Sequence, residues 1–235
     1  MSPVAGAAGK PESEQLFQQA ELDHLSDRHS EAIAGLKQIA QQSGELTCAE
    51  QLLLTAAAKA LLREKEAYME DAGLEETERL RTVEELKELC REALALCPSS
   101  YLNNPCLNCT LPAQVYYARS RGDFWRRLAT LEWGEAQAAA VAAAREAYAA
   151  AGSLVQQLHP THPSRLSLAI SRGLLLMNQL EEAESACRLF RRTLAAASLH
   201  LPTLHVDYED ALLYMDQLHS LLAEWADASR GRGEA

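Results

Sequence analysis

The sequence predicts an all-α protein of about nine helices. Apolar residues recur every three or four positions through most of the chain, which is the spacing that gives a helix one buried face. We find neither the strict alternation of a half-buried strand nor a period near 34 residues that would indicate a tetratricopeptide array. With 235 residues, 48% of them hydrophobic, the chain is long enough to bury a substantial core.

The first half is expected to contain four helices. Two of them lie within residues 12–42, a third runs from 47 to about 68, and a fourth spans 74–96. The polar residues 26–30 predict a tight bend between the first two. Thr47 and Glu50 have the spacing of a capping box, which opens the third helix. The sequence Asp71-Ala-Gly73 is expected to end it.

The second half is expected to contain five helices. They are predicted at residues 113–131, 135–151, 163–179, 180–198 and 206–228, after an irregular link at 98–112 that is dense in proline and asparagine. The alanine-rich segment at 135–151 has a high helix propensity and permits close helix packing. A helical domain at 12–228 is thus expected between a disordered tail at 1–11 and a short flexible tail at 229–235.

Charge and hydropathy limit the possible partners and location. The formal charge of -11 disfavours nucleic acid and anionic membranes, which would be repelled at long range. No apolar run approaches the roughly 20 residues that span a bilayer, and the N-terminus lacks the apolar centre of a signal peptide. We therefore expect a cytoplasmic protein that binds neither nucleic acid nor membrane.

The cysteines and histidines give little sign of catalysis. Only Cys106 and Cys109 have metal-ligand spacing, with Cys97 as the sole candidate third ligand. A zinc or redox site there is one alternative, and reduced thiols, which are usual in a cytosol, are the other. The seven histidines stand near no nucleophile at a recognisable spacing. We expect no enzyme activity, no catalytic residue, no bound metal and no cofactor.

Two sequence blocks carry a family resemblance. The segments 115–128, VYYARSRGDFWRRL, and 159–169, HPTHPSRLSLA, resemble the 14-3-3 proteins, and the similarity extends from Leu16 to Trp225. The resemblance implies a bundle of nine antiparallel helices that acts as a dimeric, phosphopeptide-binding adaptor in signal transduction. In this chain the tips of the third and fourth helices are shorter than in the family.

The resemblance also places a phosphate pocket, with a reversed charge in it. Lys59 and Arg126 match the family's lysine and fifth-helix arginine, whereas Glu66 replaces an arginine and Arg127 replaces a tyrosine. A dianionic phosphate needs several cationic donors. Lys59, Arg63 and Glu66 are spaced i, i+4 and i+7, so they share a helix face, and we expect Glu66 to neutralise the pocket. The alternative is that Glu66 points to solvent and Arg127 replaces the lost arginine.

The rest of the peptide groove is altered in the same direction. Two asparagines that clamp the peptide backbone in the family correspond to Ser171 and Leu221, which lack the bidentate amide. Ile170, Leu174 and Trp225 match the apolar wall of the groove. Ordinary helix packing is the alternative explanation for these three apolar residues.

A family-type dimer is expected to use the first four helices. The residues that match its interface are Leu22, Arg28, Glu31, Arg81 and Glu85. Arg28 is expected to pair with Glu85 of a second subunit, and Glu31 with Arg81. Exposed ion pairs contribute little, so the apolar area must supply the affinity. The shortened helix tips reduce that area, which favours a weak homodimer or a heterodimer with family members.

The predicted function is that of a non-enzymatic, 14-3-3-like adaptor. It is expected to bind protein segments in an amphipathic groove, with reduced or absent dependence on phosphoserine or phosphothreonine. A conventional phosphopeptide-binding adaptor is the first alternative. A redox or zinc-binding protein using Cys106 and Cys109 is the second.

Overall fold

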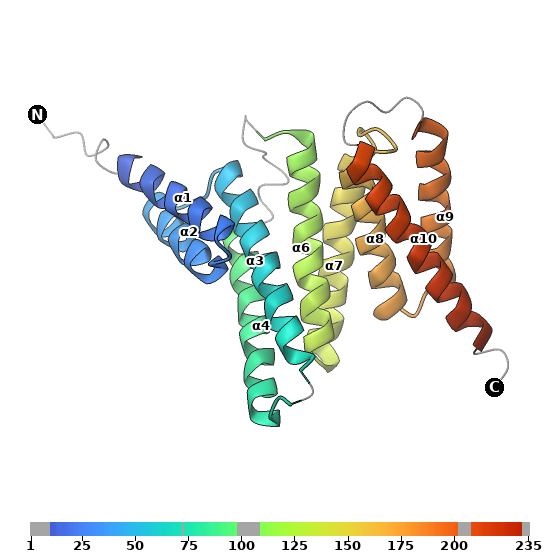
Figure 1. Ribbon diagram of the computed structural model, residues 1–235, viewed down its shortest axis with the longest axis horizontal. Helices are drawn as coiled ribbons and strands as arrows, with labels where there is room; N and C mark the ends of the chain where they lie inside the picture. The colour runs from blue at the N-terminus through green and yellow to red at the C-terminus, as the bar shows by residue number, and fades with distance from the viewer. Residues whose placement is uncertain (1–9, 72, 98–108, 202–207, 232–235) are drawn as a thin grey trace, which may run out of the picture. The chain divides into compact units, whose positions relative to one another are not determined.

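The regular structure is entirely helical over the part of the chain that the computed structural model describes, residues 10–71, 73–97, 109–201 and 208–231 (Figure 1). The nine helices within these ranges are α1 (Lys10–Leu25), α2 (His29–Ser43), α3 (Cys48–Met69), α4 (Glu76–Leu96), α6 (Leu111–Leu131), α7 (Gly134–Val155), α8 (Pro163–Asn178), α9 (Ala183–His200) and α10 (Tyr208–Gly231). The all-α prediction is confirmed. None of these helices combines the length and apolar character that crossing a membrane requires.

The chain divides into two compact units. The N-terminal unit comprises residues 1–109 and holds α1 to α4, and the C-terminal unit comprises residues 110–235 and holds α6 to α10. The predicted domain at 12–228 spans both units. Most of the predicted tails, 1–9 and 232–235, and most of the predicted link, 98–108, lie outside the described residues.

Two local signals organise the N-terminal unit. The bend between α1 and α2 turns at Asp27, whose φ of 59° is in the left-handed region that aspartate tolerates better than most residues. The predicted capping box opens α3: the Thr47 hydroxyl accepts the Glu50 N–H, and Glu50 Oε2 accepts the Thr47 N–H at 2.6 Å. Packing of α1 on α2, α2 on α3 and α3 on α4 then buries Leu36, Leu54 and Leu86.

The C-terminal unit contains two close helix contacts made possible by glycine. A Cβ at Gly122 of α6 would lie 2.4 Å from the Tyr148 ring of α7, and one at Gly173 of α8 would lie 2.1 Å from the Phe190 ring of α9. Neither distance is sterically possible, so each glycine lets an aromatic ring pack against a helix backbone. Phe190 is fully buried and stacks on Trp225 of α10, with ring centroids 5.0 Å apart.

Several helix ends differ from the predicted positions. The helix α6 begins at Leu111 rather than residue 113, because the Thr110 hydroxyl caps it and Pro112 is tolerated in a first turn. The helix α9 begins at Ala183 rather than residue 180, since Glu181 has a φ of 55° and interrupts the helical path. A glutamate is not a residue that sequence reasoning assigns to a left-handed position.

Candidate functional site

The predicted phosphate-site residues of the N-terminal unit lie on α3. Lys59 and Glu66 are both half-buried, and one carboxylate oxygen of Glu66, Oε1, is buried. Arg63 is exposed, and its Nε donates a hydrogen bond to the carbonyl oxygen of Lys59 at 3.2 Å. The alternative interpretation required the Glu66 side chain to point into solvent. The burial of Oε1 shows that it does not extend fully into solvent.

The predicted phosphate-site residues of the C-terminal unit, Arg126 and Arg127, lie on α6 and are half-buried. One turn before them, Asp123 Oδ1 accepts a hydrogen bond from the Tyr148 hydroxyl at 2.7 Å. Burial, reinforced by the Asp123 charge, raises the pKa of Tyr148 well above its ordinary value, and the charge of Arg126 opposes that increase. Arg126 thus lies near the Asp123 carboxylate and the buried Tyr148 phenol, a grouping that was not predicted from the sequence.

These two groups of residues belong to different units. Lys59 and Glu66 are held by the N-terminal unit, and Arg126 and Arg127 by the C-terminal unit. The complete cationic pocket stays a prediction.

The predicted groove residues lie on α8 and α10 of the C-terminal unit. Ile170, Ser171 and Trp225 are buried, at 6%, 8% and 9% exposure. Ile170 and Trp225 belong to the core cluster around Phe190, and Leu174 and Leu221 pack against it while partly exposed. Leu174 and Leu221 are therefore the two predicted groove residues with apolar surface open to a ligand.

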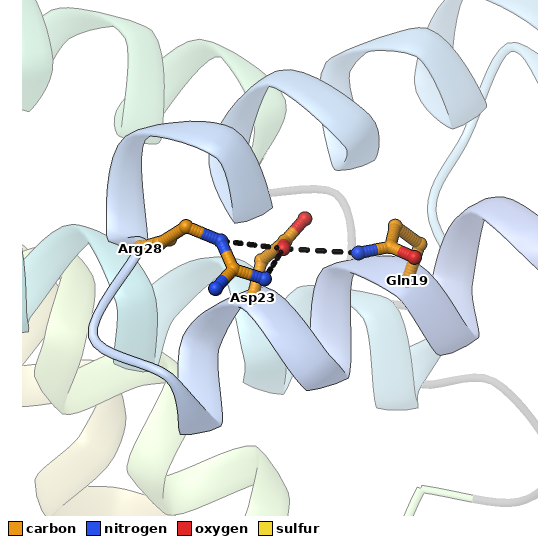
Figure 2. A network of polar contacts seen from close by, with 3 residues as sticks. All are labelled: Gln19, Asp23 and Arg28. Atoms are coloured by element: carbon orange, nitrogen blue, oxygen red, sulfur yellow. Dashed lines mark hydrogen bonds and ion pairs between the residues drawn. The ribbon is translucent and has the colours of Figure 1, made fainter.

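Three of the four charged residues of the predicted dimer surface, Arg28, Arg81 and Glu85, already have partners within their own chain. Figure 2 shows Arg28 at the bend after α1, bonded through Nε at 3.0 Å to Asp23 Oδ1, which also accepts a hydrogen bond from Gln19. Hydrogen bonding to Arg28 lowers the pKa of Asp23. On α4, Glu85 contacts Arg81 at 3.4 Å and accepts a hydrogen bond from Lys65 of α3 at 2.6 Å.

The remaining predicted dimer residues are exposed. Leu22 of α1 is 57% exposed, and Leu80 of α4, which the sequence analysis did not assign to the interface, is 58% exposed. Glu31 of α2 is also exposed. An intermolecular Arg28–Glu85 pair must exchange with the intrachain pairs, so it adds less to association than a newly formed pair would.

Of the two cysteines with metal-ligand spacing, the structure describes Cys109. Cys106 lies outside the described residues, and the sulfur of Cys109 lies 2.8 Å from the sulfur of Cys48, at the start of α3. Among the residues that the structure describes, no group of three or more histidines, cysteines or carboxylates could hold a metal ion. The Cys48–Cys109 contact was not predicted because 61 positions separate the two residues.

The sequence profile of the 14-3-3 protein family matches residues 19–226. The chain belongs to the 14-3-3 family. It is 26% identical to 14-3-3 protein zeta of Bombyx mori, over 95% of this chain and 96% of that protein. It is 28% identical both to 14-3-3 protein beta/alpha of Gallus gallus and to a 14-3-3 protein of Giardia intestinalis, over 92% of this chain and 94% of each relative.

Family membership supports an adaptor role. Proteins of the 14-3-3 family are generally non-enzymatic adaptors that bind protein partners and form dimers. The similarity covers nearly the whole chain at 26–28% identity, so this chain is a divergent member of the family.

Proposed function

We propose that this 14-3-3 protein is a cytoplasmic, non-enzymatic adaptor that binds protein segments in an amphipathic groove with reduced dependence on phosphorylation. One observation carries the proposal. Glu66, which stands where the family has an arginine, shares a face of α3 with Lys59 and has a buried carboxylate oxygen. A phosphate that approaches this face meets a like charge close to the lysine that would bind it.

The repulsion between Glu66 and a phosphate group is large enough to change which ligands bind. Two unit charges 4 Å apart interact by about 4 kcal/mol at an effective dielectric constant of about 20. Micromolar binding corresponds to roughly 8 kcal/mol. Exchanging an attractive arginine for a repulsive glutamate can therefore remove most of the affinity that a phosphate group provides.

The groove residues support the same conclusion. Ser171 is buried and Leu221 is apolar, so neither supplies the amide that holds an extended peptide backbone in the family. Leu174 and Leu221 instead each provide partly exposed apolar surface at the edge of the core. This composition favours a partner that binds through apolar side chains.

A conventional phosphopeptide-binding adaptor is the second candidate. It is favoured by Arg126 and Arg127, two consecutive half-buried arginines on α6 whose guanidinium groups suit phosphate oxygens. Both candidates include a family-type homodimer or heterodimer.

A charge reversal at Glu66 separates the two candidates. Glu66→Arg is expected to raise affinity for a phosphoserine peptide at least tenfold, with little gain for the unphosphorylated peptide, as measured by fluorescence polarisation. Glu70→Arg is the matched control, because it makes the same charge change at the exposed C-terminal end of α3. Submicromolar binding of the phosphopeptide by the wild type, unchanged in Glu66→Arg, would establish the conventional adaptor instead.

A further inference from the structure

A basic pocket in the C-terminal unit is lined by none of the residues discussed for the groove. It is formed by α8, α9 and the C-terminal end of α7, and has a volume of about 200 Å³. Arg165 and Arg172 of α8 and Arg192 of α9 line it, together with polar Gln156 and Thr193. None of the residues that line this pocket is acidic.

The three arginines come from two neighbouring helices, α8 and α9. Arg165 is half-buried, and its Nη1 donates to the Leu158 carbonyl at 3.1 Å, which fixes the guanidinium while leaving most of its five N–H donors available. Arg172 reaches across to α7, where its Nη1 would lie 3.4 Å from a Cβ at Gly152. Arg192 is exposed on α9. Three guanidinium groups lining one small pocket raise its local positive potential, which favours an anion.

A pocket in the N-terminal unit gives the internal contrast. It is lined by Lys37 and Lys65 together with Glu85 and Glu92, and each lysine forms an ion pair with one of these glutamates. That pocket neutralises its own charge. The C-terminal pocket has cations from two helices and no carboxylate among its lining residues, so its composition points to a ligand that brings the negative charge.

The size and chemistry of the pocket define the ligand. We propose that the pocket formed by Arg165, Arg172 and Arg192 binds a small anion carrying one or two phosphate groups. Guanidinium groups bind phosphate oxygens in a bidentate geometry, which makes arginine better suited to this role than lysine. A volume of about 200 Å³ is below the roughly 300 Å³ where drug-sized ligand pockets begin, so it fits a phosphate or diphosphate group.

This proposal is independent of the proposed adaptor function. The pocket uses none of the α3 or α6 residues assigned to the phosphopeptide site, and all of its lining residues belong to the C-terminal unit. Binding here can succeed or fail whether or not the groove depends on phosphorylation.

Isothermal titration of the 235-residue chain with inorganic pyrophosphate tests the proposal. We expect saturable binding that weakens at least tenfold in Arg172→Gln and in Arg192→Gln, and that weakens further at high salt because it is largely Coulombic. Arg191→Gln is the matched control: it removes the same charge one position away, from an exposed residue outside the pocket. Its affinity is expected to stay within about twofold of the wild type, as expected for a single screened surface charge.

Several outcomes would overturn the proposal. They are the absence of saturable binding, an equal loss in Arg191→Gln, or a loss caused by Arg126→Gln instead of the pocket variants. Free phosphoserine distinguishes the source of the anion. If it binds with the same dependence on Arg172 and Arg192, the pocket takes a phosphorylated side chain; if only pyrophosphate binds, it takes a small free anion. Either of these two results supports the site.

Discussion

Each unit of this molecule has a pocket with charged lining residues, and the two pockets differ in how those charges are matched. In the N-terminal unit, Lys65 pairs with Glu85, Arg28 pairs with Asp23, and two cysteine sulfurs are in contact. In the C-terminal unit, arginines from two helices surround a pocket without a carboxylate in its lining. The overall charge of -11 therefore says little about anion binding, which depends on how local charges are matched.

The sequence contains a trace of this difference. Residues 1–109 hold all five lysines and 19 of the 33 acidic residues, whereas residues 110–235 hold twelve arginines and no lysine. Arginine retains its charge and its planar donor geometry in partly buried positions. An all-arginine cation set in one unit is the signal that could have pointed to a site there.

The largest expected effect concerns the sulfur contact of the N-terminal unit. Hydrogen peroxide should oxidise Cys48 and Cys109 to a disulfide, with the two thiol hydrogens and the peroxide leaving as two waters. Closing a loop of 61 positions should raise the free energy of unfolding by about 4 kcal/mol in the chain-entropy description. Peptide mapping and denaturant unfolding measure both results.

Cys187→Ser is the control for this experiment, because Cys187 belongs to the other unit. It should form the same cross-link as the wild type, whereas Cys48→Ser should not. Cross-links that involve other cysteines instead would contradict the pairing of these two thiols.

The next effect tests the C-terminal pocket by adding the carboxylate that its lining lacks. Gln156→Glu changes little in size but brings a negative charge to the pocket, so pyrophosphate affinity should fall at least tenfold, which is about 1.4 kcal/mol. Gln157→Glu adds the same charge at an exposed neighbour outside the lining and should have a much smaller effect. If both variants lose the same amount of pyrophosphate affinity, the effect comes from net charge and not from the lining of the pocket.

The reverse experiment removes carboxylates from the N-terminal pocket. In a protein that already carries Arg172→Gln and Arg192→Gln, adding Glu85→Gln and Glu92→Gln should create pyrophosphate binding through Lys37 and Lys65. We expect it to be weaker than at the arginine pocket, because lysine cannot hold phosphate in a bidentate geometry. No gain of binding in calorimetry would show that unmatched cations alone do not make a site in this protein.

The smallest effect is a pH dependence of the N-terminal pairs. Hydrogen bonding to Lys65 lowers the pKa of Glu85 below its ordinary value of 4.5. The ion pair between Glu85 and Lys65 therefore stabilises the folded state above pH 4.5, and this contribution is lost as the pH falls through the lowered pKa of Glu85. The melting temperatures of the wild type and Glu85→Gln should differ slightly at neutral pH and converge in acid. A difference that persists in acid would assign the effect to packing rather than to charge.

Local signals made much of the fold predictable. The Thr47–Glu50 capping box, the bend after α1 and the start of α8 at Pro163 all depend on residues within one turn of each other. The start of α9 was wrong because Glu181 adopts a left-handed conformation that its side chain does not favour. Such a conformation is imposed by the neighbouring structure.

The sites were less predictable than the fold because they depend on tertiary packing. Arg172 and Arg192 lie on different helices with no characteristic spacing, so their common pocket is not visible in the sequence. Ile170 and Leu174 were assigned the same groove role, yet the first is buried and the second partly exposed. Both are apolar, and sequence alone does not separate a core face from a binding face one turn apart.

The ion pair between Asp23 and Arg28 has a consequence for the choice of dimer partner. A second subunit that recruits Arg28 releases Asp23, so association exchanges one ion pair for another and gains little affinity from the charges. If the carboxylate of the partner subunit is poorly placed, the Arg28–Asp23 pair is broken and no intermolecular pair replaces it, which disfavours association. In a family-type dimer we therefore expect these two residues to favour some family members over others as partners, with exposed apolar side chains such as Leu22 supplying the affinity.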